Sequence, residues 1–123
     1  MWIPVAFGGV LGTLARFGVQ QFVGVRAPTA FPTATLIVNL VGSAILGLVM
    51  GYAAATGTLN ARVQAGIATG FCGAFTTMSA FAFETTSLLS AGQYGRAAIY
   101  LAVTIAGSIG SVALGILIAQ RLA

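Results

Sequence analysis

The segment Gly70–Glu84 reads GFCGAFTTMSAFAFE and is the least ordinary part of a strongly apolar sequence. Its fifteen positions hold two glycines, consecutive hydroxyls, four phenylalanines and the only acidic residue of the chain. At membrane depth, polar and backbone-loosening residues are tolerated where they are buried in protein or line a wet path. We therefore interpret this segment as the functional centre that the other segments support.

The composition indicates an integral membrane protein. The 123 residues are 59% hydrophobic and 5% charged, with a mean hydropathy of +1.04. Soluble domains carry about 25% charged residues, so an ordinary globular protein is excluded. The length suits about four spans of roughly 20 residues. Because Met1–Pro4 has no basic side chain, we expect the first apolar segment to be a retained span, not a signal peptide.

The chain lacks most residues that catalysis uses. It contains no histidine and no lysine, one thiol (Cys72) and one carboxylate (Glu84). Metal-assisted hydrolysis and most acid–base reactions need more groups than these, and a single cysteine forms no intrachain disulfide. We therefore expect no enzyme, and a lipid bilayer but no nucleic acid among its partners.

The third apolar segment, about 62–90, is too long for a simple span. As one helix it would extend roughly 43 Å, against a hydrocarbon core of about 30 Å. Tilt could absorb part of the excess, but a break near Gly73–Thr77 that gives two half-helices is the simpler account. The other spans are expected at about 2–23, 33–55 and 96–119. The fold class is thus an all-α membrane protein with four transmembrane helices in a single domain, 1–123.

Breaker residues separate these spans. Pro28 and Pro32 mark a loop at Val25–Pro32. Short turns are expected at Thr56–Asn60 and Ser90–Gly95.

Small residues recur on one face of three spans and predict close helix contacts. They fall at helical spacing in the first span (Gly8, Gly9, Gly12), the second (Ser43, Gly47 and Gly51, on the face that also holds Asn39) and the fourth (Gly107, Ser111, Gly115).

Two polar residues in the first and second spans each have two interpretations. Asn39 either joins helices through its amide or faces a permeant anion as a donor. Arg16 either snorkels to the interface or points inward. An inward Arg16 would pair with Glu84 or raise the positive potential at an anion entrance.

The polar residues of the later spans also leave alternatives. Tyr100, Thr104 and Ser108 form an i, i+4 hydroxyl stripe, which is either a polar lane or a set of hydroxyls bonded to their own backbone. Glu84 is a site for proton or cation coupling, the partner of an arginine, or a hydrogen-bonding gate. The spacing does not choose among these.

A break inside a membrane frees backbone groups that need partners. Freed carbonyls can coordinate a small hard cation, whereas freed amides and half-helix N-termini favour anions. Phe75, Phe81 and Phe83 add rings with electropositive edges, which suit a small anion, although plain packing is the commoner use of such rings.

The arginines barely select an orientation. With four spans, Arg62 and Arg121 lie on the side of the termini and Arg26 and Arg96 on the other, with Arg16 nearer the second group. The protein could therefore insert both ways and pair as an antiparallel homodimer, unless the weak bias suffices. Four spans are also few to enclose a pore, which favours an oligomer.

These motifs resemble one family in all four spans. Gly70–Glu84 resembles the third-helix signature of the Fluc (CrcB) fluoride channels, which reads roughly GFCGGFTTFSTFSxE. Thr35–Ser43, TLIVNLVGS, is similar to their second-helix TLxVNxxGS, and Gly8–Arg16, GGVLGTLAR, to their first-helix GGxxGxxxR. The stripe Tyr100, Thr104, Ser108 is similar to the fourth-helix pattern.

The resemblance implies a fold and a function. It implies an antiparallel (dual-topology) homodimer in the cell inner (plasma) membrane that passively exports fluoride from the cytoplasm. It also implies a structural sodium ion at the dimer centre, held by the backbone carbonyls of Gly73 and Thr76 from each subunit.

By the same resemblance, Asn39 would be the fluoride-contacting amide and Phe81 a pore-lining ring. Tyr100, Thr104 and Ser108 would line the fourth-helix side. Ser79 and Glu84 match a polar track beyond the rings, and Arg16 matches the family's first-helix arginine.

The sequence departs from the family pattern at four positions. Met78 stands where a second pore phenylalanine is usual, and its flexible, polarizable thioether should let conduction survive at an altered rate. Ala80 replaces a track threonine, which puts the need for that hydroxyl in doubt. Ala74 and Ala44 look like packing variations.

Two other functions compete with this interpretation. A small multidrug-resistance-type proton-coupled transporter is also short and four-spanning, but needs a first-span carboxylate, and the only carboxylate here is in the third span. A non-transporting subunit of a membrane complex would have no evident use for the ordered polar motifs.

Overall fold

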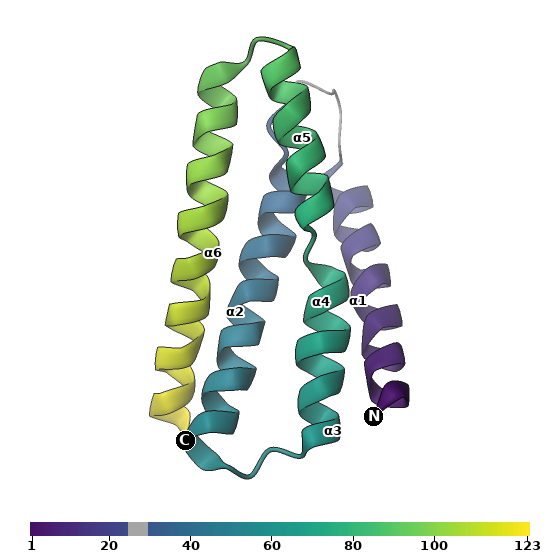
Figure 1. The fold of residues 1–123 in the computed structure, drawn as a ribbon, viewed down its shortest axis with the longest axis vertical. Coiled ribbons are helices and arrows are strands. Elements are labelled where there is room, and N and C mark those ends of the chain that lie inside the picture. The colour runs from purple at the N-terminus through teal and green to yellow at the C-terminus, as the bar shows by residue number, and fades with distance from the viewer. Residues whose placement is uncertain (25–29) are drawn as a thin grey trace.

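The protein is a bundle of long helices (Figure 1). The structure, a computed structural model, describes residues 1–24 and 30–123. Four segments within these residues are long and apolar enough to cross a membrane: Trp2–Val23, Thr33–Thr56, Ala61–Ser90 and Tyr94–Leu122. The described residues contain no strand. The prediction of an all-α, four-span membrane protein is confirmed.

The helices are close to the expected spans. They are α1 (Trp2–Val23), α2 (Thr33–Thr56), α3 (Ala61–Gln64), the π-helical η1 (Ala65–Cys72), α4 (Gly73–Phe75), α5 (Met78–Ser90) and α6 (Tyr94–Leu122). The fourth span is longer at both ends than predicted. Of the predicted loop at Val25–Pro32, residues 25–29 lie outside the described part of the chain, and Pro32 caps the start of α2.

The turns predicted at Thr56–Asn60 and Ser90–Gly95 are shorter in the structure, at residues 57–60 and 91–93, and depend on residues suited to them. Gly57 ends α2 in the left-handed conformation, at φ 63°, which favours glycine. Asn60 starts α3 by accepting a hydrogen bond from the Arg62 amide at 2.8 Å. Gly92 has φ 75° in the last turn. The breaks between the spans are therefore encoded locally.

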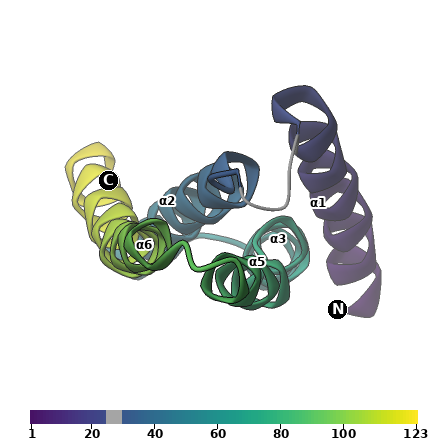
Figure 2. The same cartoon turned by 90° about the horizontal axis from the view of Figure 1, so that it is seen from above.

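Glycines bring the spans together in two pairs. α2 packs mainly on α6, and α1 packs on η1 and α4 (Figures 1 and 2). A Cβ atom on Gly47 would meet the Val112 carbonyl of α6, and one on Gly12 would meet the Phe71 carbonyl of η1. Backbone contact of this closeness is possible only for small residues. The predicted small-residue faces are confirmed.

The third span is broken near its middle. Gly73–Phe75 is still helical, Thr76 is extended (φ −83°, ψ 157°), Thr77 is extended (φ −149°, ψ 115°), and α5 begins at Met78. The ribbon unwinds between α4 and α5 in Figure 1. A break was predicted, but it is narrower than the expected Gly73–Thr77. The π-helix η1 before it was not predicted from the sequence.

Candidate functional site

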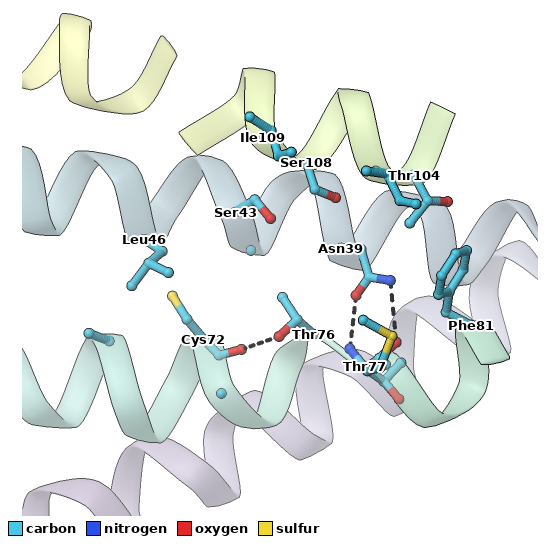
Figure 3. Close-up of a pocket in the computed structure, with 15 residues that line it drawn as sticks. Asn39, Ser43, Leu46, Cys72, Thr76, Thr77, Phe81, Thr104, Ser108 and Ile109 are labelled. Carbon is cyan, nitrogen blue, oxygen red and sulfur yellow. Dashed lines mark hydrogen bonds between the residues drawn. The ribbon is translucent and has the colours of Figure 1, made fainter. Parts of the chain in front are cut away.

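The break is fixed to α2 by one side chain. The Asn39 Nδ2 atom donates to the Thr77 carbonyl at 3.3 Å, and the Thr77 amide donates to Asn39 Oδ1 at 2.8 Å (Figure 3). Asn39 is buried. Its carboxamide thus satisfies both backbone groups of one residue at membrane depth, where an unpaired group would be costly. Asn39 joins two helices, as one of the two sequence interpretations has it.

The break diverts two amides, those of Thr77 and Ala80, from their helical acceptors. In a continuous helix the Thr77 amide would donate to the Gly73 carbonyl and the Ala80 amide to the Thr76 carbonyl. Instead, Thr77 donates to Asn39, and the Ala80 amide donates to Thr77 Oγ1 at 3.2 Å, as in an N-cap. The Gly73 and Thr76 carbonyls therefore lose their usual donors within one turn of each other.

Arg16 also contacts the break. Its Nε atom donates to the Ala74 carbonyl at 3.0 Å, replacing the amide that a continuous helix would supply. The suggestion that Arg16 pairs with Glu84 is therefore wrong. The physical reason is position, because α1 packs against η1 and α4, whereas Glu84 lies beyond the break on α5.

A groove of about 430 Å³ runs beside the break, between α2, the third span and α6 (Figure 3). It brings together seven of the residues singled out in the sequence: Asn39, Gly73, Thr76, Met78, Phe81, Thr104 and Ser108. Ser43 lines it as well. The groove is thus walled by amide, hydroxyl, carbonyl and ring groups from three separate spans.

Thr104 has an unusual environment in this groove. It is 6% exposed, and within the described part of the chain its Oγ1 atom has no hydrogen-bond partner. A threonine in a helix ordinarily bonds back to a carbonyl of the preceding turn, which for Thr104 does not occur. A buried hydroxyl without a partner calls for an explanation such as an unseen water or ion.

Glu84 belongs to a separate hydrogen-bonded cluster. Its Oε2 atom accepts from Thr35 Oγ1 at 3.0 Å, and its Oε1 atom accepts from the Tyr100 hydroxyl at 3.1 Å. Tyr100 is fully buried and meets Phe81 edge-on, with ring centroids 5.0 Å apart and an interplanar angle of 64°. Phe81 also lines the groove, so it contacts both the groove and the cluster around Glu84.

The remaining predicted residues lie at the surface or in packing. Met78 is 75% exposed at the edge of the groove. Ser79 is exposed, with its Oγ atom 3.3 Å from Thr77 Oγ1. Phe83 is exposed, whereas Phe75 is buried and stacked on Phe71 with centroids 5.3 Å apart. Of the three rings considered, only Phe81 lines the groove.

Sequence reasoning gave no role to two residues that the site uses. Thr35 binds Glu84, and its position four residues before Asn39 on the same helical face was an available signal. Thr77 accepts and donates through its backbone as well as its hydroxyl. Its backbone role leaves no mark on residue type, so the only available signal was that threonine is a common N-cap residue.

Comparison with known proteins shows the family to which the chain belongs. The family model described as "CrcB-like protein, Camphor Resistance (CrcB)" matches residues 3–116. "Fluoride-specific ion channel FluC 2" of Moorella thermoacetica is 41% identical over 118 residues, which cover 96% of this chain and 89% of the relative. "Fluoride-specific ion channel FluC" of Syntrophotalea carbinolica is 39% identical over 120 residues, 98% of each chain. The protein of the same name from Ignicoccus hospitalis is 42% identical over 118 residues, 96% of this chain and 94% of the relative. With a match of this extent and relatives of this identity, the chain belongs to the CrcB family.

Proposed function

We propose that the chain forms a fluoride-selective channel that lets fluoride leave the cytoplasm passively. The proposal is supported by the family and by relatives that carry the name of fluoride-specific ion channels. The observation that carries it is the Thr104 hydroxyl in the groove wall, which has no hydrogen-bond partner among residues 1–24 and 30–123. A hydroxyl that is desolvated and unbonded can donate to a small anion without first breaking another bond.

The rest of the groove suits an ion that must exchange water for weak donors. Asn39 has a second amide hydrogen beyond the one given to Thr77, and Ser108 adds a hydroxyl one turn from Thr104. The edge of the Phe81 ring is electropositive, and α5 begins beside the groove with the positive end of its helix dipole. The pathway then continues past Phe81 toward Tyr100, with Glu84 as a gate that holds the tyrosine hydroxyl.

The channel is an antiparallel homodimer in this proposal. A single chain forms only an open groove, Met78 in its lining is exposed, and Ser79, the next residue of the chain, is exposed as well. A second copy on this face would cover the groove and bury these side chains. The nearly even distribution of arginines permits insertion in both orientations. The bilayer would be the plasma membrane.

A structural sodium ion at the dimer centre fits the donors at the break. Sodium prefers oxygen ligands, and the Gly73 and Thr76 carbonyls are both released from the helical ladder. Two copies would supply four such carbonyls. The ion would balance the carbonyl dipoles and hold the two breaks together, while the chain's own residues handle fluoride.

The first prediction concerns selectivity. Liposomes that contain the purified protein and are loaded with fluoride should release the fluoride rapidly, as followed by a fluoride electrode. Release should be passive because the groove offers hydrogen-bond donors to the anion and conduction through it needs no coupled reaction. The matched control is release of chloride, which should be negligible. Absence of fluoride release together with proton-driven uptake of a cationic drug would instead support the multidrug-transporter alternative.

The second prediction separates stability from conduction. Thr104→Val replaces an unbonded buried hydroxyl with a methyl group, so the free energy of unfolding should stay equal or rise by about 1 kcal/mol. Fluoride release should nevertheless fall at least tenfold. Thr86→Val, which removes an exposed hydroxyl bonded to the Ala82 carbonyl, should leave release unchanged. Full release by Thr104→Val would exclude this hydroxyl from the pathway.

The third prediction concerns sodium. Replacement of sodium by a large organic cation on both sides of the membrane should abolish fluoride release, because the Gly73 and Thr76 carbonyls would lose the ion that they coordinate. Restored sodium should rescue it. Release that is indifferent to sodium would remove the ion from the proposal and leave the channel function standing.

A further inference from the structure

A second groove lies on the other side of the third span, away from the proposed pathway. It has a volume of about 360 Å³ and runs between α1 and the α3–η1 segment. Its walls are mostly apolar, and its lining residues are Pro4, Phe7, Gly8 and Leu11 of α1 and Arg62, Val63, Gly66, Ile67 and Phe71 of the third span. A Cβ atom on Gly8 would meet the Gly66 carbonyl, so the two backbones touch at this point and the larger side chains stand on either side.

The groove has one polar end. Arg62 is the second residue of the third span, and Trp2, which is 88% exposed, is the first residue of α1. The N-terminus and α3 lie at the same end of the bundle in Figure 1. Tryptophan and arginine at span ends are typical of the membrane–water interface. The groove therefore begins with a cation at the interface and continues as an apolar slot toward the bilayer interior.

The chain supplies no side-chain anion for this cation. Its only carboxylate, Glu84, lies on α5 beyond the break and accepts hydroxyl bonds from Thr35 and Tyr100. A second copy of the chain would bring five more arginines and one more glutamate in the same environment. Charge complementarity thus favours an anion from the membrane over another copy, and basic pockets between transmembrane helices bind anionic lipid headgroups.

We propose that this groove binds an anionic phospholipid. The phosphate group lies at the Arg62 guanidinium, and one acyl chain lies along the walls that Phe7, Leu11 and Ile67 form. The backbones of α1 and the third span touch at Gly8 and Gly66. The lipid fills the groove between the two helices beside this contact. The site is independent of the fluoride pathway, which lies between the third span, α2 and α6.

The chain carries its own reporter for this site. Trp2 is the only tryptophan and lies two residues from Pro4 at the polar end of the groove. Quenching of its fluorescence by acyl chains brominated near the headgroup measures lipid contact in reconstituted bilayers. At equal mole fractions, brominated phosphatidylglycerol should associate about 5-fold more strongly than brominated phosphatidylcholine, as expected when one arginine lies beside a headgroup of net negative charge and not beside a zwitterionic one.

Three variants identify the site. Arg62→Gln should reduce the preference to about one, whereas Arg121→Gln, at the same end of the bundle on α6 (Figure 1), should keep it. Val63→Phe enlarges a wall residue that is 47% exposed, so it should weaken phosphatidylglycerol association without disturbing the core. Thermal unfolding midpoints of all three should match the native protein within a few degrees, which shows that the variants are folded.

Several results would overturn the proposal. Equal association of both lipids with the native protein would show that the groove has no headgroup preference. A preference that survives Arg62→Gln would arise from general surface charge. Shielding of Trp2 from both lipids would show that a second copy or another protein covers the groove. Because the readout is lipid contact, none of these results depends on fluoride conduction.

Discussion

The contact between the Asn39 carboxamide and the Thr77 backbone makes the rest of the site possible. A helix interrupted inside a bilayer leaves amides and carbonyls without hydrogen-bond partners, and the bilayer core contains no water that could bond them instead. Asn39 supplies one donor and one acceptor to Thr77. The Thr77 Oγ1 atom accepts from the Ala80 amide, and Arg16 donates to the Ala74 carbonyl. These few bonds compensate for the break and leave the Gly73 and Thr76 carbonyls available.

The break also determines what each side of the third span can do. On the side of α2 and α6 it opens a groove with hydroxyl, amide and ring groups, and an unbonded Thr104 hydroxyl within it. On the side of α1, glycine contacts leave an apolar groove that ends at Arg62. One span therefore separates a surface suited to an anion and a second copy from a surface suited to lipid. The single acidic residue lies beyond the break, where two hydroxyls bind it.

Much of this arrangement was predictable from the sequence, and the exceptions have physical causes. Apolar length and glycine spacing predicted the four spans and their close contacts, because both depend on residue type alone. The excess length of the third segment predicted a break, but its confinement to Thr76 and Thr77 depends on bonds from Asn39 on another helix. The suggested pairing of Arg16 with Glu84 followed charge alone, whereas the fold directs Arg16 to a carbonyl. The π-helix η1 and the role of Thr35 likewise depend on which helix faces which.

The most direct test of this account is amide hydrogen exchange over residues 73–80 in the reconstituted protein. In Asn39→Ala the Thr77 amide and carbonyl lose their partner, so exchange of this segment should accelerate at least tenfold, equivalent to about 1.4 kcal/mol of local stability. Ser43→Ala, one turn along α2 in the same groove, should leave exchange unchanged. Native-like protection of residues 73–80 in Asn39→Ala would contradict the claim that this side chain holds the break.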